Sequence, residues 1–204
     1  MTTKTIAHRL KENGDSRALV FESPVNRGLL GLLAFIGTEV MFFGGLISAF
    51  IILRAGTLTW PPIDQPRLPV AVTGINTFIL LFSGFTMAQA IRSIRAQNSN
   101  LTRWLLATAA LGAIFLVVQG SEWLRLVGYG LTFTSSIYGG TFYTLIGFHA
   151  LHVVGAMIAL LFVLRKSFLQ KYTPADHDGV ILCGAYWYFV VAIWPMLYIL
   201  VYLN

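Results

Sequence analysis

Long apolar runs separated by short polar connectors dominate the sequence. Five runs cover residues 28–53, 70–91, 104–127, 137–164 and 180–203. Each contains roughly 22 to 28 residues, so a helix rising about 1.5 Å per residue would exceed a hydrocarbon core about 30 Å thick. The pattern predicts an all-α, polytopic membrane protein, in which a bundle of five transmembrane helices forms one domain over residues 28–204.

The polar segments before and between the runs carry residues typical of loops. Residues 1–27 form a polar N-terminal segment, and the connectors contain Pro61, Pro62, Asn100 and Pro174. The first run lies too far from the N-terminus and is too long for the core of a signal peptide, so we expect it to stay in the mature protein. No segment repeats another.

The Lys and Arg residues divide unequally between the two sides that five crossings would define. The larger group, in the N-terminal segment and the second and fourth connectors, is Lys4, Arg9, Lys11, Arg17, Arg27, Arg92, Arg95, Arg103, Arg165, Lys166 and Lys171. The other side has Arg54, Arg67 and Arg125. Because cytoplasmic loops are enriched in Lys and Arg, we expect residues 1–27 in the cytoplasm and the C-terminus on the outer, periplasmic side.

The composition excludes several other classes of protein. Hydrophobic residues make up 56% of the chain and charged residues only 11%, against about 25% charged residues in soluble domains. There are too few polar side chains for a cytosolic enzyme, a disordered tail or a secreted disulfide-rich domain. The formal net charge of +6 is explained by orientation in the membrane, so we expect no nucleic-acid partner.

One acidic residue, Glu39, lies near the middle of the first run. Its helical neighbours at three and four residues are Phe35, Ile36, Phe42 and Phe43. Because a carboxylate is costly in such surroundings, we expect either a protonated acid or a cationic partner on another helix. Two interpretations stay open: a proton-handling or partner-facing carboxyl, and a protonated acid that is hydrogen-bonded across a helix interface.

Two histidines, His149 and His152, lie midway along the fourth run, three residues apart on one helix face. Two histidines on a single turn cannot bind opposite sides of one haem iron, and the sequence lacks the further inward ligands that a dinuclear metal site needs. We therefore expect this chain to bind no metal and no redox cofactor. We expect the two neutral imidazoles to form hydrogen bonds between helices.

Other polar and small residues in the runs predict helix packing. Glu122 lies one turn from Arg125, and we expect an ion pair between them. Asn76 is expected to form a hydrogen bond between helices. Small residues at four-residue spacing predict close approach of helices. They include Gly44, Gly45, Gly112 and Gly155. No P-loop, Gly-x-Ser-x-Gly or His-Glu-x-x-His motif occurs, so no catalytic site is predicted.

Four of the runs carry longer motifs, which occupy Gly31–Leu46, Gly74–Gly84, Leu111–Trp123 and Tyr138–Val153. Their sequences and their order resemble those of subunit III of the haem-copper terminal oxidases, the cytochrome c and quinol oxidases. Each motif is long, and each falls on a separately predicted span. The five predicted spans resemble the short bacterial form of this family, so the resemblance implies a multi-pass protein of the bacterial cytoplasmic (inner) membrane.

The last run departs from the family pattern. It reads Trp187-Tyr-Phe-Val-Val-Ala-Ile-Trp194, so Tyr188 and Val191 stand where the family usually has a histidine and an aspartate. Any role of those two polar groups is absent or replaced in this chain. The difference keeps a related alternative open, the subunit that accompanies nitric-oxide reductases.

The resemblance implies a subunit that is not catalytic alone, with haem and copper in partner subunits. It implies that the chain packs mainly on subunit I, near subunit II and further respiratory-complex subunits, and that it binds membrane phospholipid. It also implies support of proton uptake and stability during aerobic electron transport to O2, with cytochrome c or quinol as the electron donor. Glu39, Glu122, His149 and His152 align with recurrent polar positions of the family. We expect these four residues to organise the bundle and its face toward subunit I.

Two unrelated alternatives are less well supported by the sequence. A small proton-coupled transporter could use Glu39 as a relay, but transporters usually contain inverted repeats and broken helices. An odd number of spans without internal repeats provides neither. A haem- or quinone-binding membrane enzyme would need more ligands than the apolar runs supply.

Overall fold

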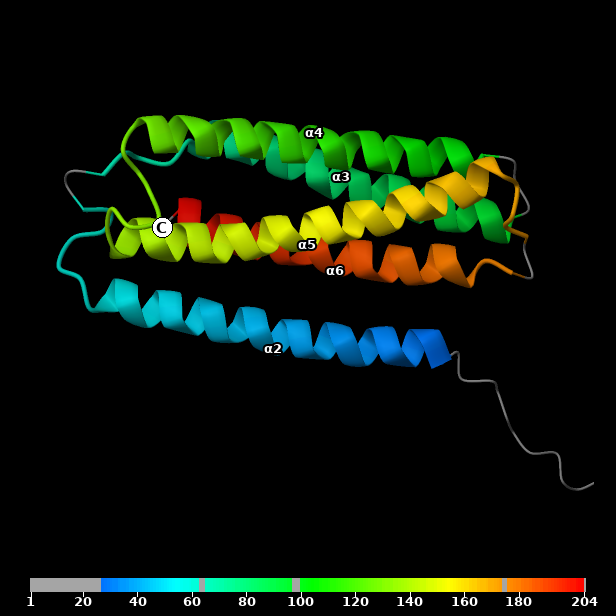
Figure 1. The fold of residues 1–204 in the computed structure, drawn as a ribbon, viewed down its shortest axis with the longest axis horizontal. Coiled ribbons are helices and arrows are strands. Elements are labelled where there is room, and N and C mark those ends of the chain that lie inside the picture. Colours follow the sequence, from blue (N-terminus) through cyan, green and yellow to red (C-terminus); the bar gives the residue numbers. More distant parts are fainter. Residues whose placement is uncertain (1–26, 63–64, 97–99, 174–175, 204) are drawn as a thin grey trace, which may run out of the picture.

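The protein folds into five long α-helices (Figure 1). The structure, a computed structural model, describes residues 27–62, 65–96, 100–173 and 176–203. Its helices are α2 (Arg27–Ala55), α3 (Val70–Arg95), α4 (Leu101–Gly128), α5 (Ile137–Phe168) and α6 (Asp178–Tyr202). All five are long and apolar enough to cross a membrane. The expected all-α arrangement, with five helices long and apolar enough to span a membrane, is therefore confirmed for these residues. The polar segment expected at 1–27 lies outside them except for Arg27.

The helices extend slightly beyond the apolar runs that predict them. Helix α3 continues to Arg95 and α5 to Phe168, and each carries basic residues in its last turn. Cations are favourable near a helix C-terminus and in the headgroup region, so these turns stay helical after the apolar pattern ends. At the other end of α5, the Ser136 hydroxyl accepts a hydrogen bond from the Gly139 amide at 3.1 Å and caps the helix.

Helices α3 to α6 pack together, and α2 lies along one side of them, against α5 and α6 (Figure 1). In the most apolar stretch of α2 only 11% of the residues are buried, compared with 50% in α6. Phe43 and Phe50 are the buried residues of α2. Most of the surface of α2 is therefore left for lipid or for another protein.

Two tryptophans of α6 connect it to α3. Trp187 Nε1 donates to the Ser83 hydroxyl at 3.1 Å, and Trp194 Nε1 donates to the Thr77 hydroxyl at 2.9 Å. Both indole rings are almost completely buried. Lipid tails are as apolar as leucine, so polar bonds and close packing of this kind hold transmembrane helices together. The two contacts fix α6 against α3 at two levels of the bundle.

The glycines differ in how closely neighbouring helices approach them. A Cβ added at Gly112 would lie 2.5 Å from Met157 Cε and 2.6 Å from Trp187 Cη2, so this glycine makes the close contact expected of it. A Cβ added at Gly44, Gly45 or Gly155 would meet no atom within 4 Å. These three glycines face outward, so no other helix of this chain approaches them closely, in contrast to the expectation.

Candidate functional site

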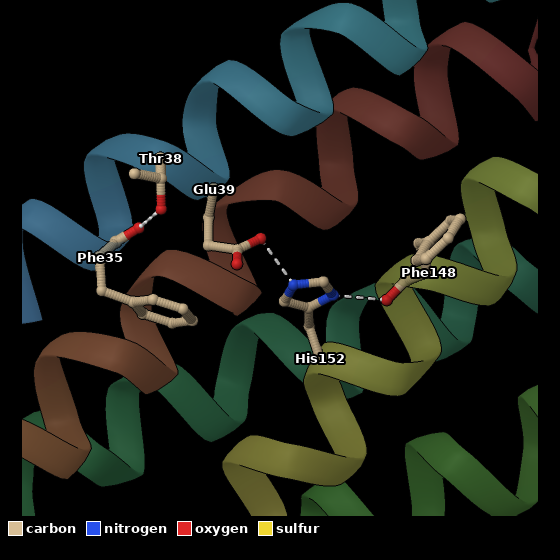
Figure 2. Close-up of polar contacts among 5 residues, drawn as sticks. All are labelled: Phe35, Thr38, Glu39, Phe148 and His152. Carbon is tan, nitrogen blue, oxygen red and sulfur yellow. Dashed lines mark hydrogen bonds and ion pairs between the residues drawn. The ribbon is translucent and has the colours of Figure 1, made fainter.

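A carboxyl and an imidazole meet between α2 and α5. Figure 2 shows the Glu39 side chain on α2 extending toward the His152 ring on α5. Glu39 Oε2 lies 2.7 Å from His152 Nε2, a distance that is typical of a charge-assisted hydrogen bond. The two side chains are 16% and 13% exposed, respectively. The contact joins residues 113 positions apart in the sequence.

The hydrogen bond of His152 Nδ1 determines which protonation states the Glu39–His152 pair can adopt. His152 Nδ1 lies 2.6 Å from the Phe148 carbonyl oxygen. A carbonyl can only accept, so Nδ1 carries a hydrogen and donates it. One further proton is shared between Nε2 and the Glu39 carboxyl, either as neutral imidazole with protonated acid or as imidazolium with carboxylate. Both forms have zero net charge, so the pair avoids an uncompensated charge in an apolar layer.

Aromatic rings surround the pair. The Phe43 and His152 ring centroids are 5.1 Å apart in an edge contact, and Phe42 lies 6.3 Å from the same imidazole. Phe148 packs edge-on against Phe42 at 5.0 Å. Because water is largely kept away, the hydrogen bond acts in surroundings of low polarity, where it is stronger than in water.

The pair also connects α2 to the rest of the bundle. Among the described residues, it is the only hydrogen bond or ion pair between a side chain of α2 and a side chain of another helix. The Thr38 and Ser48 hydroxyls bond instead to carbonyls of α2 itself. Any change to Glu39 or His152 therefore acts on the position of α2.

His149, three residues before His152, faces a different part of the bundle. Its side chain is buried among α4, α5 and α6, where it stacks on Trp194 at 4.9 Å and meets the edge of Phe115 at 6.4 Å. Neither ring nitrogen has a hydrogen-bond partner in the protein. The expected hydrogen bond between helices is therefore present for His152 and absent for His149 among the described residues, where the His149 ring packs on the indole instead.

The other polar positions lie apart from this pair. Glu122 forms the expected ion pair with Arg125, at 2.8 Å, near the end of α4. Asn76 Nδ2 donates to the Phe115 carbonyl at 3.1 Å and links α3 to α4, as expected. Helix α2 makes no contact with either of these helices. The four acidic and histidine positions thus form separate contacts, of which Glu39 and His152 alone come together.

The two departures from the family pattern have different surroundings. Val191 is buried against Gly84 of α3, with 3.5 Å between the valine Cγ1 and a Cβ placed on the glycine. An aspartate there would need a polar partner inside the bundle. Tyr188 is 37% exposed, so its ring reaches the surface of the bundle. Within the described ranges, no group of three or more His, Cys, Asp or Glu side chains could hold a metal ion.

Two residues near the polar positions were not singled out from the sequence. Trp194 supports the His149 ring, and the Tyr202 hydroxyl accepts a hydrogen bond from Gln119 Nε2 at 3.0 Å. Trp194 is part of the last-helix motif at 187–194, so the sequence offered a signal that could have identified it. Tyr202 lies at the end of an apolar run, where aromatic residues are common in any membrane protein.

Comparison with known proteins agrees with this architecture. The sequence profile of the family described as cytochrome c oxidase subunit III matches residues 16–204. A Mycobacterium leprae protein described as probable cytochrome c oxidase subunit 3 is 36% identical over 175 residues, covering 85% of this chain and 86% of the relative. The cytochrome c oxidase subunit 3 of Thermostichus vulcanus is 37% identical over 177 residues, covering 86% of each chain.

A third relative differs somewhat in length. The cytochrome c oxidase subunit 3 of a Synechocystis species is 37% identical over 177 residues, which cover 86% of this chain and 75% of the relative. The profile match includes all five helices and both members of the Glu39–His152 pair. The chain therefore belongs to the cytochrome c oxidase subunit III family, the non-redox membrane subunits of haem-copper oxidase complexes.

Proposed function

We propose that this chain packs on subunit I of a respiratory oxidase and supports its proton uptake and sustained turnover, without carrying electrons itself. The observation that carries the proposal is the Glu39–His152 pair, whose Oε2 and Nε2 atoms lie 2.7 Å apart among aromatic rings. A neutral pair of this kind fixes α2 and leaves no net charge in the lipid layer. Its role is to position helices rather than to transfer a proton in each catalytic cycle.

The contact with subunit I is assigned here to the open face of α2. This helix is mostly exposed within the chain, and Gly44 and Gly45 leave room for close approach by another helix. Met41, on the same helix, is 79% exposed. The names of the relatives favour cytochrome c as the electron donor of the complex.

Phospholipid binding is assigned to an apolar groove of about 320 Å³ between α2, α5 and α6. Its walls include Leu32, Phe35, Val163, Leu182 and Tyr186. An acyl chain fits this lining. Exposed basic residues at the same end of the bundle supply charge for a phosphate headgroup. They are Arg27, Arg165 and Lys166.

Gentle purification from the native membrane tests membership of the complex. Tagged chain should be recovered with haem and copper, seen in the visible spectrum and by metal analysis, and with oxidase activity. Bound phospholipid should be found by mass spectrometry. Recovery of a stable, colourless homo-oligomer would contradict the proposal.

The Glu39→Gln variant tests the supporting role, with Val117→Leu on the exposed side of α4, away from the open face of α2, as the control. The glutamine amide can still donate a hydrogen bond to His152 Nε2, so we expect an assembled complex that retains most of its initial turnover. Oxygen consumption should be followed over many turnovers. Complete loss of activity in an intact complex would instead indicate that Glu39 transfers protons in each cycle.

A further inference from the structure

Several polar atoms inside the α3–α6 bundle have no partner in the protein. They include Asn76 Oδ1, Gln119 Oε1 and both ring nitrogens of His149. The three residues are 1%, 3% and 1% exposed, respectively, so bulk solvent does not reach them in the structure. Buried polar atoms in proteins are nearly always hydrogen-bonded, because an unpaired one loses its bonds to water without replacement. Four such atoms on α3, α4 and α5 therefore lack the partners that buried polar groups usually have.

These atoms belong to one continuous region. Asn76 bonds through its amide nitrogen to the carbonyl of Phe115, and the Phe115 ring touches His149. Gln119 lies one turn further along α4 on the same face, a rise of about 6 Å. It bonds to the Tyr202 hydroxyl at the end of α6. Trp194 lies at the centre of this region, because its ring contacts His149, Phe115 and Tyr202 at 4.9, 5.0 and 6.4 Å.

The chemistry of the unpaired atoms restricts the ligand. A neutral imidazole presents one N–H donor and one acceptor, while each amide oxygen only accepts. An apolar ligand satisfies none of them, and a cation or an anion would satisfy one kind and repel the other. Water donates and accepts, and a buried water typically makes about three hydrogen bonds.

We propose that ordered water molecules occupy this region and hydrogen-bond to His149, Asn76 and Gln119. They exchange with the aqueous phase through a pocket of about 550 Å³ at the end of the bundle where α3 begins and α6 ends. Tyr202 lines this pocket and also bonds to Gln119, so it separates the pocket from the unpaired atoms. His149 is thus hydrated from one side of the membrane, whereas the Glu39–His152 pair is outside this region.

Hydroxyl-radical footprinting of the assembled oxidase by X-ray radiolysis tests the proposal, because bound water generates radicals next to buried side chains. The bundle offers a matched pair of reporters. Trp187 and Trp194 are both on α6, are 1% and 0% exposed, and each donates to a hydroxyl of α3. Only Trp194 stacks on His149. We expect Trp194 to be oxidised several-fold faster than Trp187, and equal rates would overturn the proposal.

Two variants and an isotope exchange complete the test. Asn76→Leu and His149→Phe remove polar atoms from the region, so each should lower the Trp194 rate toward that of Trp187. If an assembled variant oxidises Trp194 at the wild-type rate, the assignment of water to this region is overturned. If a variant does not assemble, the comparison of Trp194 with Trp187 in the wild type decides alone. Rapid mixing with H2(18)O before irradiation should place heavy oxygen on Trp194. Product with ordinary oxygen alone would overturn exchange through the pocket.

Discussion

Replacing both members of the Glu39–His152 pair with leucine should be less damaging than replacing either one. In Glu39→Leu, the Phe148 carbonyl still holds the hydrogen on His152 Nδ1, so Nε2 is left as an unpaired acceptor in an aromatic environment. In His152→Leu, the Glu39 carboxyl is left unpaired instead. An unsatisfied buried polar group costs about 1–3 kcal/mol. Because the two side chains are 13% and 16% exposed, we expect the lower half of that range, about 1–2 kcal/mol for each single variant.

The double variant leaves neither group unpaired. Replacing both partners of a buried polar pair with apolar groups of similar size is often nearly neutral. We therefore expect Glu39→Leu with His152→Leu to recover most of the loss, so the coupling free energy approaches the sum of the two single losses, about 2–4 kcal/mol. Each single variant should therefore lower the equilibrium constant for docking of α2 onto the bundle roughly 5- to 30-fold.

Retention of this subunit in the purified oxidase measures the effect. The tagged complex is washed with increasing detergent, and the fraction of subunit retained is plotted for wild type, both single variants and the double variant. Val117→Leu, at an exposed position of α4 and away from the open face of α2, should follow the wild-type curve. If the double variant loses as much as the two single variants combined, the pair does not couple α2 to α5 and the reasoning is refuted.

Three further predictions concern packing, charge and topology. Gly112→Ala should lower the free energy of unfolding by roughly 1–3 kcal/mol, because the added Cβ would meet Trp187 and Met157. Gly120→Ala, on the same helix but with open space around it, should leave that free energy unchanged. Equal melting temperatures for the two variants would contradict the close packing at Gly112. Arg125→Met should lower the free energy of unfolding by roughly 0.5–1.5 kcal/mol, because Glu122 loses its ion-pair partner at 2.8 Å. Adding Glu122→Gln to that variant should restore part of the lost stability. If Arg125→Met melts at the wild-type temperature, the ion pair contributes nothing to stability. A phosphatase reporter fused after the last residue should be active and a fluorescent reporter dark, because five crossings from the expected cytoplasmic N-terminus would place the C-terminus outside. The reverse pattern would contradict either the orientation or the number of spans.

Hydropathy was sufficient to predict the helices of this protein. The run at 28–53 corresponds to α2 at Arg27–Ala55, and the run at 180–203 to α6 at Asp178–Tyr202. The apolar layer demands helices with satisfied backbone groups, so length and apolar content determine each span. The ends of α3 and α5 were placed a few residues too early, because a helix can continue among polar side chains in the headgroup region.

Hydropathy does not determine which way a helix is rotated. His149 and His152 were expected on one face, yet three residues correspond to about 300° around a helix, which leaves the side chains about 60° apart. That difference is enough for His149 to enter the core while His152 meets Glu39. The rotation of α2 is set by its few contacts with α5 and α6, which no local pattern reports. For the same reason, spacing predicted the contact at Gly112 and also at Gly44, where none exists within the chain.

The separation of Glu39 and His152 in the sequence has a consequence for biogenesis. Helix α2 is synthesised first among the described helices but packs only against α5 and α6. The ribosome must add 113 residues after Glu39 before His152 exists. At roughly 5–20 residues per second, this takes about 6 to 23 s. During that interval Glu39 has no partner within the chain, so α2 must wait with its acid protonated, or beside the insertion machinery, until the later helices arrive.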